Sequence, residues 1–158
     1  MMVVTNPPPE LALFPALIQL PVQWGDQDAF GHVNNIVYFR WFESSRIAYL
    51  ERIGLGGKQA GGLASVENVG PILAAIGCNY RRQIKYPDTV IVGARITRIG
   101  RSSMTMSHMV WSSTHQAVAA DGESTVVVFD YAANQPKRVP DLYRALIEKL
   151  EGRKLEPA

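Results

Sequence analysis

Hydrophobic and polar positions follow two different periods along this chain, and the periods divide it into elements. Between Ile18 and Trp24 apolar and polar residues alternate one by one, which is typical of a half-buried strand. From Asn35 to Ile53 the apolar positions follow a helical spacing and cover most of the helix circumference. A helix that is apolar nearly all round is buried on several sides. The pattern therefore predicts a strand, a loop over residues 25–34 and a long buried helix.

The two ends of this helix carry separate signals. Asn34 or Asn35 can serve as the N-cap, because an asparagine side chain accepts a hydrogen bond from an unpaired backbone amide. Gly54 supplies a left-handed stop at the other end. The glycine-rich segment 54–62 is predicted to be mobile. It resembles no phosphate-binding loop, since no helix opening with Gly-Lys-Ser/Thr follows it.

The second half of the chain has the pattern of a β-meander. Four strands are predicted, over residues 66–83, 88–100, 103–113 and 117–130, because breaks such as Tyr86-Pro87-Asp88 separate them. The run Val126–Phe129 is continuously apolar, as in a central strand. Pro140 then opens a short helix that we expect over residues 141–150.

These elements predict one α+β domain over residues 18–158, in which an antiparallel sheet wraps around the central helix. A single-layer sheet leaves its outer face open, which favours dimerisation through that face or through an edge strand. Residues 1–17 precede the domain. Three consecutive prolines, Pro7 to Pro9, predict an extended arm there.

Composition narrows the class of protein. The chain has 158 residues, 47% of them hydrophobic, which suits a single domain with a sizeable core. A formal net charge of +2 does not indicate a nucleic-acid partner. Two groups of cations stand out, and they comprise Arg81, Arg82 and Lys85, then Arg95, Arg98 and Arg101. Such groups are typical of a solvated surface, while a small anion such as a nucleotide phosphate is the second interpretation.

The single cysteine, Cys78, excludes an intrachain disulfide and a cysteine metal cluster. Residues 1–20 show neither a basic signal-peptide start nor an uninterrupted apolar run long enough to span a bilayer. We therefore expect a cytoplasmic protein without a membrane partner.

The loop before the central helix contains most of the candidate catalytic residues. Asp26 and Asp28 are its only acids, and either carboxylate can lie beside the amide-rich start of the helix. Those amides can donate to a carbonyl oxygen, while an aspartate acts as nucleophile or as general base for water. Aspartates in such loops also serve as turn or cap residues. Likewise His32 suits either packing or function, and the two asparagines suit capping as well as catalysis.

The run Trp24-Gly25-Asp26-Gln27-Asp28-Ala29-Phe30-Gly31-His32-Val33-Asn34-Asn35, followed by Tyr38 and Arg46, closely resembles the hotdog-fold acyl-CoA thioesterases. The resemblance is to the branch typified by 4-hydroxybenzoyl-CoA thioesterase. It extends over roughly residues 18–140 and includes Tyr86-Pro87-Asp88 and the Gly100–Ser103 turn. Some relatives carry a tyrosine and a histidine where this chain has two asparagines.

The resemblance implies a role for each matching position. The catalytic carboxylate falls on Asp28 and the amide that polarises the carbonyl on Asn35, with His32 as an assisting candidate. Nucleotide contacts fall on Arg101, Ser102 and Ser103, often from a neighbouring subunit. We further expect Trp24, Phe30, Val33 and Tyr38 to line the acyl pocket.

The sequence therefore predicts a hydrolase that cleaves an acyl-CoA thioester to a free acid and coenzyme A. It would need no cofactor and no metal. We expect a homodimer or homotetramer with sites at the subunit interface. Three alternatives stay open: a thioesterase acting on acyl carrier protein, a non-catalytic acyl-CoA-binding protein, and, last, a hydratase.

Overall fold

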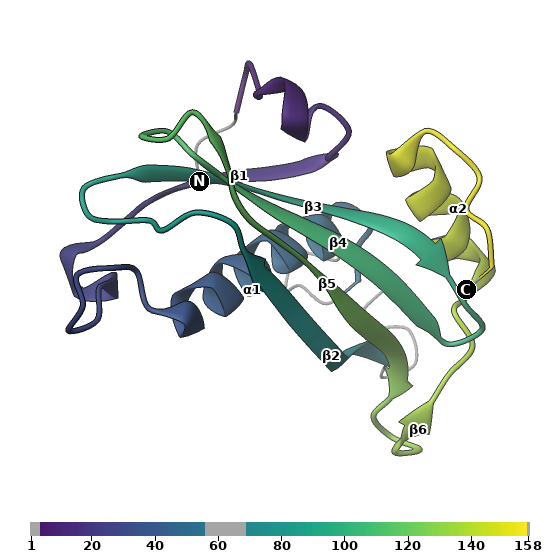
Figure 1. Cartoon of the computed structure of the whole chain (residues 1–158). Coiled ribbons are helices and arrows are strands. Elements are labelled where there is room, and N and C mark those ends of the chain that lie inside the picture. Colours follow the sequence, from purple (N-terminus) through teal and green to yellow (C-terminus); the bar gives the residue numbers. More distant parts are fainter. Residues whose placement is uncertain (1–3, 56–68, 158) are drawn as a thin grey trace.

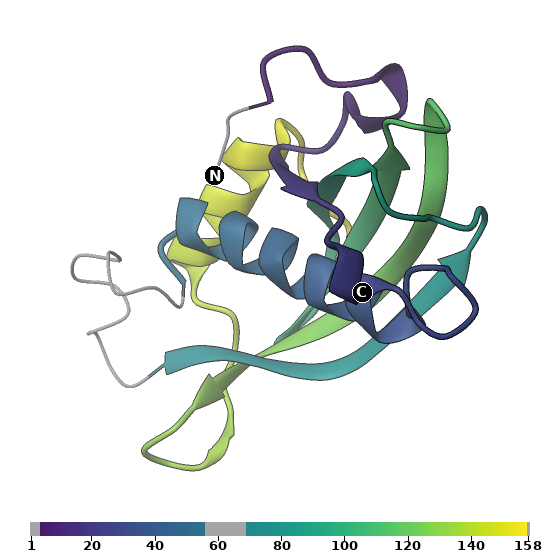
Figure 2. The same ribbon diagram turned by 90° about the vertical axis from the view of Figure 1, so that its left-hand side faces the viewer.

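The computed structural model describes residues 4–55 and 69–157 and shows the predicted α+β hotdog fold (Figures 1 and 2). The sheet contains β1 (Ala16–Pro21), β2 (Val69–Tyr80), β3 (Thr89–Ile99), β4 (Ser103–Ser112), β5 (Ala117–Asp130) and the short β6 (Gln135–Pro136). Its order is β1-β3-β4-β5-β2, with β6 on β5, and every pairing is antiparallel. The helices are α1 (Asn35–Arg52) and α2 (Asp141–Glu151), and two 3-10 turns cover Pro9–Leu11 and Trp24–Asp26. The sheet curls around α1.

Both ends of α1 follow the sequence signals. The Ile36 N–H donates to Asn34 Oδ1 at 3.0 Å, so Asn34 is the N-cap. Gly54 has a φ of +75°, a left-handed conformation that glycine adopts without steric cost. Residues 56–62 of the predicted glycine-rich mobile segment, and residues 66–68 of the predicted second strand, lie outside the described residues. Neither described helix is long and apolar enough to cross a bilayer.

The burial of α1 differs from the prediction of a helix buried on several sides. Its buried residues recur every three or four positions and form one broad face: Val37, Tyr38, Trp41, Phe42, Ser45, Arg46, Tyr49 and Leu50. The opposite face carries Ile36 and Ile47, which are 59% and 46% exposed. The sheet curls around one side of the helix only, so these isoleucines remain uncovered in a single chain.

The core lies between α1 and the concave face of the sheet, and β3 shows this division clearly. Val90, Val92 and Ala94 point inward and are fully buried. The intervening Ile91 belongs to a separate small cluster on the outer face. This alternation follows from the two-residue period of a strand. Helix α1 also packs closely on β5, because a Cβ at Gly122 would overlap the Gly77 carbonyl and the Phe42 ring.

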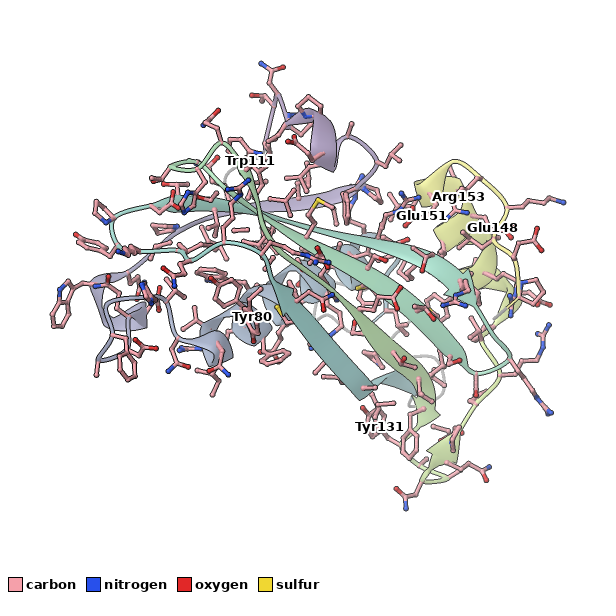
Figure 3. The ribbon with its side chains drawn as sticks, viewed as in Figure 1. Tyr80, Trp111, Tyr131, Glu148, Glu151 and Arg153 are labelled. Carbon is pink, nitrogen blue, oxygen red and sulfur yellow. The ribbon has the colours of Figure 1, made fainter. Side chains whose placement is uncertain are left out.

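The segment before β1 differs from the expected extended arm. Leu11 is fully buried and packs with Ile91 and Trp111, and Phe14 joins the same cluster on the outer face. Figure 3 shows Trp111 next to this N-terminal segment. Strand β1 begins at Ala16, two residues earlier than predicted. The outer face is therefore partly covered by the chain itself rather than open.

Helix α2 protects the edge of β3 beyond the end of β1. The last β1 pair in this direction joins Ala16 to Ala94, which leaves the Ile96 N–H without a β1 partner. Glu151, labelled on α2 in Figure 3, accepts this N–H at 2.7 Å and the Tyr49 hydroxyl at 2.7 Å through the same oxygen. This buried carboxylate therefore ties α2 to both the sheet and α1.

The connections lie at two opposite ends of the sheet (Figure 1). The loop before α1, the β2–β3 connection and the β4–β5 turn lie together at the left-hand end. The β3–β4 turn lies at the right-hand end with α2 and the C-terminus. Strand β3 runs between the two ends over 11 residues, or roughly 35 Å at about 3.3 Å per residue.

Candidate functional site

The loop before α1 is closed by its own backbone. The Asp28 N–H donates to the His32 carbonyl at 2.9 Å, and the Gly31 N–H donates to the Asp28 carbonyl at 3.1 Å. Gly31 has a φ of +77°, which an L side chain rarely adopts. A bridge between Gln27 and Val33 closes the base of the loop. Asp28 therefore sits at the first position of a tight turn beside the start of α1.

The two acids of the loop differ in what their oxygens can do. Asp28 Oδ1 accepts the Phe30 N–H at 2.8 Å. For Asp28 Oδ2 no hydrogen-bond partner is found among the described residues, and the side chain is half-buried. Asp26 Oδ2 accepts the Gln23 N–H at 2.8 Å, and the Asp26 carbonyl accepts the Asn34 N–H at 2.8 Å. Asp26 thus shapes the loop, while Asp28 keeps one carboxylate oxygen for another partner.

The first turn of α1 leaves one amide available. The Ile36 and Val37 N–H groups donate to the side chain and the carbonyl of Asn34. For the Asn35 N–H no partner is found within residues 4–55 and 69–157. An unpaired amide at a helix N-terminus favours a negatively charged or partly negative oxygen. This geometry suits the stabilisation of an oxyanion.

A hollow of about 330 Å³ collects five of the predicted site residues: Asp28, His32, Val33, Asn35 and Tyr38. Trp24 and Phe30, which we expected in the acyl pocket, do not line it and are 75% and 85% exposed. Their loop positions turn them outward in a single chain. The structure thus brings the acid, the histidine and the free amide together, and it leaves these two aromatics at the surface.

Four residues that sequence reasoning did not assign to the site complete the hollow, namely Tyr80, Arg81, Arg82 and Gln83. All four come from the end of β2 and the connection after it. The Tyr80 hydroxyl donates to the Asn35 carbonyl at 3.3 Å, and Figure 3 shows Tyr80 where β2 approaches the start of α1. The sequence shows Arg81 and Arg82 as neighbouring cations, but only the curl of the sheet brings them to the hollow that Asp28 lines.

Tyr38 forms the buried wall of the hollow. Its ring meets Tyr80 edge-on, with centroids 5.0 Å apart, and lies 5.1 Å from Trp41. Burial raises the pKa of the Tyr38 hydroxyl to about 12. At neutral pH the hydroxyl therefore stays protonated, so Tyr38 can shape the hollow but cannot act as a base.

The predicted nucleotide-binding turn is not part of this hollow. Arg101, Ser102 and Ser103 lie at the β3–β4 turn, at the opposite end of the sheet (Figure 1). The Ser102 and Arg101 carbonyls accept the Val128 and Val139 N–H groups, which fixes the turn against the rest of the sheet. One chain alone therefore cannot bring Arg101 to Asp28. In addition, no group of three or more His, Cys, Asp or Glu residues that could hold a metal is found among the described residues.

Residues 22–147 match the model of the Thioesterase-like superfamily. This match spans the loop before α1, α1 itself and strands β2 to β6. The chain therefore belongs to this superfamily.

Solved structures agree with that placement. A thioesterase from Thermus thermophilus, solved with coenzyme A and zinc, is 33% identical, with 91% of this chain and 99% of that chain covered and a TM-score of 0.77. A thioesterase-superfamily structure from Jannaschia sp. CCS1 has the same TM-score over 89% of this chain and 85% of that one, and its 21% identity supports the fold alone. A shorter match, 24% identical over 91 residues, joins 58% of this chain to 57% of the uncharacterized protein YsmA from Bacillus subtilis.

Proposed function

We propose that this protein hydrolyses an acyl-CoA thioester, with Asp28 as the catalytic carboxylate and the Asn35 N–H as the oxyanion donor. The observation that carries the proposal is that one hollow holds both the Asp28 Oδ2 atom and the Asn35 amide, for which no partner is found among the described residues. Coenzyme A in the Thermus relative supports the choice of thiol carrier.

In the proposed reaction the thioester carbonyl oxygen accepts the Asn35 N–H. Asp28 removes a proton from water, whose oxygen attacks the carbonyl carbon. When the tetrahedral intermediate collapses, the C–S bond breaks and the proton on Asp28 passes to the departing sulfur. In the other version an Asp28 carboxylate oxygen attacks the carbonyl carbon, and the C–S bond breaks to give a mixed anhydride and a thiolate. Water then hydrolyses the anhydride, which releases the acid and the Asp28 carboxylate, and the proton set free protonates the thiolate. Both versions place negative charge on the carbonyl oxygen, which is where an amide at a helix start is most effective.

Asp28→Asn tests this assignment. Asparagine keeps an oxygen that can accept the Phe30 N–H, so the loop stays folded while the negative charge is lost. We expect kcat to fall at least about 100-fold, the usual range for a positioned acid or base. Thiol release from a panel of acyl-CoA substrates measures it, and near-normal hydrolysis by the variant would contradict the assignment.

Asp26→Asn is the matched control. It makes the same chemical change two residues away and likewise keeps an acceptor for the Gln23 N–H. We expect activity close to that of the unmodified protein. An equal loss in both variants would mean that loop structure, rather than the Asp28 charge, explains the effect.

We also infer that the protein is a homodimer or homotetramer with sites at the subunit interface. Strand β2 supports this inference, because its 12 residues pair only with β5 among the described residues and leave a long free edge. Long unpaired edges are usually covered in stable proteins. The distance between Asp28 and the Arg101 turn gives independent support, since a neighbouring subunit could bring the turn to the site.

A further inference from the structure

A second hollow lies directly beside the candidate site and is rich in positive charge. It has a volume of about 600 Å³ and is formed by the β2–β3 connection and the β4–β5 turn. Arg82, Lys85 and His115 line it, and Arg82 and Gln83 line the Asp28 hollow as well. We call it the basic hollow. The shared residues make the two hollows neighbours, so one ligand can occupy both.

The cations of the basic hollow are available to a ligand. Arg82 and Lys85 are exposed, and no hydrogen bond or ion pair to either side chain is found among the described residues. Arg81 is different, since two of its nitrogens bind the Asp121 carboxylate at 2.8 and 3.2 Å. The two neighbouring arginines therefore differ: Arg81 ties the end of β2 to β5 through Asp121, while no partner is found for Arg82 among the described residues.

The single acid among the described residues of this hollow is Asp88, and its oxygens are occupied. Oδ1 accepts the Thr89 and Thr114 N–H groups at 2.7 and 3.0 Å, and Oδ2 accepts the Ser112 hydroxyl. These bonds direct the carboxylate into the β4–β5 turn. Asp88 thus organises the wall and leaves Arg82 and Lys85 for an external anion.

His115 fixes the shape of the hollow. Its Nε2–H donates to the Gln83 carbonyl at 2.7 Å, which joins the β4–β5 turn to the β2–β3 connection. The ring is exposed. Two separate loops therefore form one wall, and of the two cations that line the basic hollow Arg82 also lines the Asp28 hollow.

We propose that the basic hollow binds a phosphate of the thiol carrier, on the same subunit that supplies Asp28. The inference rests on the proposed thioesterase function. In a carrier thioester, an uncharged pantetheine arm joins the reacting carbonyl to a phosphate. Here the hollow with the acid–amide pair adjoins a hollow lined by two exposed cations, Arg82 and Lys85, and Arg82 lines both. A planar guanidinium matches phosphate oxygens in a bidentate way, and an ammonium group adds a point charge.

Two carriers present this phosphate, coenzyme A and an acyl carrier protein bearing phosphopantetheine. The double variant Arg82→Ala/Lys85→Ala tests the site by isothermal titration with coenzyme A, 4′-phosphopantetheine and pantetheine. We expect at least a tenfold weaker Kd for the phosphorylated carrier and an unchanged Kd for pantetheine. Raising the salt concentration should weaken binding of the phosphorylated probes but not of pantetheine, since salt screens exposed charges.

Titration with phosphopantetheinylated carrier protein and with its unmodified form separates the two sources. A loss confined to coenzyme A supports the nucleotide carrier, and a loss confined to the modified carrier protein supports the protein carrier. The proposal is overturned if the double variant binds all phosphorylated probes as tightly as the unmodified protein does.

Lys149→Ala/Lys154→Ala is the matched control, because it removes two exposed cations of α2 and the tail after it. It should leave every Kd unchanged. If it weakened binding as much as the Arg82/Lys85 double variant does, net charge alone would explain the effect and the proposal would be overturned. These titrations need no turnover. A failure of the Asp28 assignment therefore leaves the phosphate result readable, and the reverse is also true.

Discussion

The histidine buried under α1 shows how one residue outside the candidate site can couple stability to pH. His108 is 1% exposed, and its ring stacks on Phe42 with centroids 4.7 Å apart. The Ser45 hydroxyl donates to the Phe42 carbonyl, so its oxygen must accept the His108 Nδ1–H at 3.1 Å. Nε2 is then the acceptor of the Ser124 hydroxyl at 2.8 Å. The neutral ring satisfies both nitrogens and joins α1 to β4 and β5.

A charged imidazole does not fit this place. Burial, aided by the nearby Arg46 charge, lowers the pKa of His108 from 6.5 to about 3. Between pH 6.5 and 3 the unfolded chain therefore binds one more proton here than the folded chain. The free energy of unfolding should fall as pH drops through this window, by up to about 1.4 kcal/mol per pH unit from this residue.

His108→Asn tests this linkage. Asparagine can still donate and accept but does not titrate, so we expect lower stability at pH 7 and a shallower pH dependence. Urea unfolding between pH 5 and 6.5, at fixed protein concentration, compares the slopes in a range where most carboxylates are already ionised. Equal slopes in the two proteins would contradict a buried neutral histidine.

At the scale of elements, the sequence predicts the bounds of most helices and strands, because these depend on local patterns. The predicted bounds of α1, α2, β3, β4 and β5 agree with the structure within about one residue, because a strand or helix period is visible in the residues themselves. The segment before β1 differs more from the sequence-based expectation. Its prolines indicate an extended chain, and nothing local reveals that Leu11 packs on residues 80 and 100 positions away, Ile91 and Trp111.

Leu11→Ala tests whether this segment belongs to the stable fold. Leu11 is fully buried, and truncating a buried leucine usually costs about 2–5 kcal/mol of unfolding free energy. The control is Leu13→Ala, because Leu13 is 71% exposed and its loss should change stability by less than about 0.5 kcal/mol. Chemical denaturation measures both variants. Equal stability of the two would mean that residues 4–15 behave as a loose arm.

At the scale of the whole molecule, the sequence predicts only those residues of the candidate site that are close together in the chain. Asp28, His32 and Asn35 fall in one short run, so the resemblance found them together, and the structure places all three in one hollow. Tyr80 and Arg82 reach the same hollow only through the curl of the sheet. Their place depends on strand order and register, which no local pattern specifies.

Whether the candidate site needs two subunits also depends on the arrangement of the whole molecule. Within one chain the loop before α1, which carries Asp28, and the β3–β4 turn, which carries Arg101, lie at opposite ends of the sheet. If the neighbouring subunit supplies Arg101, a heterodimer of Asp28→Asn with Arg101→Ala contains one intact site and one doubly defective site. Co-expression with two different affinity tags isolates this heterodimer.

We expect the heterodimer to recover about half of the unmodified activity at substrate concentrations below KM, as the two-fold symmetry of a dimer requires. The activity of each homodimer should stay at least about tenfold lower. If both residues acted within one subunit, every site in the heterodimer would carry a defect and activity would stay low. Reassembled activity would therefore show that the two ends of the sheet, distant in one chain, form one site across two.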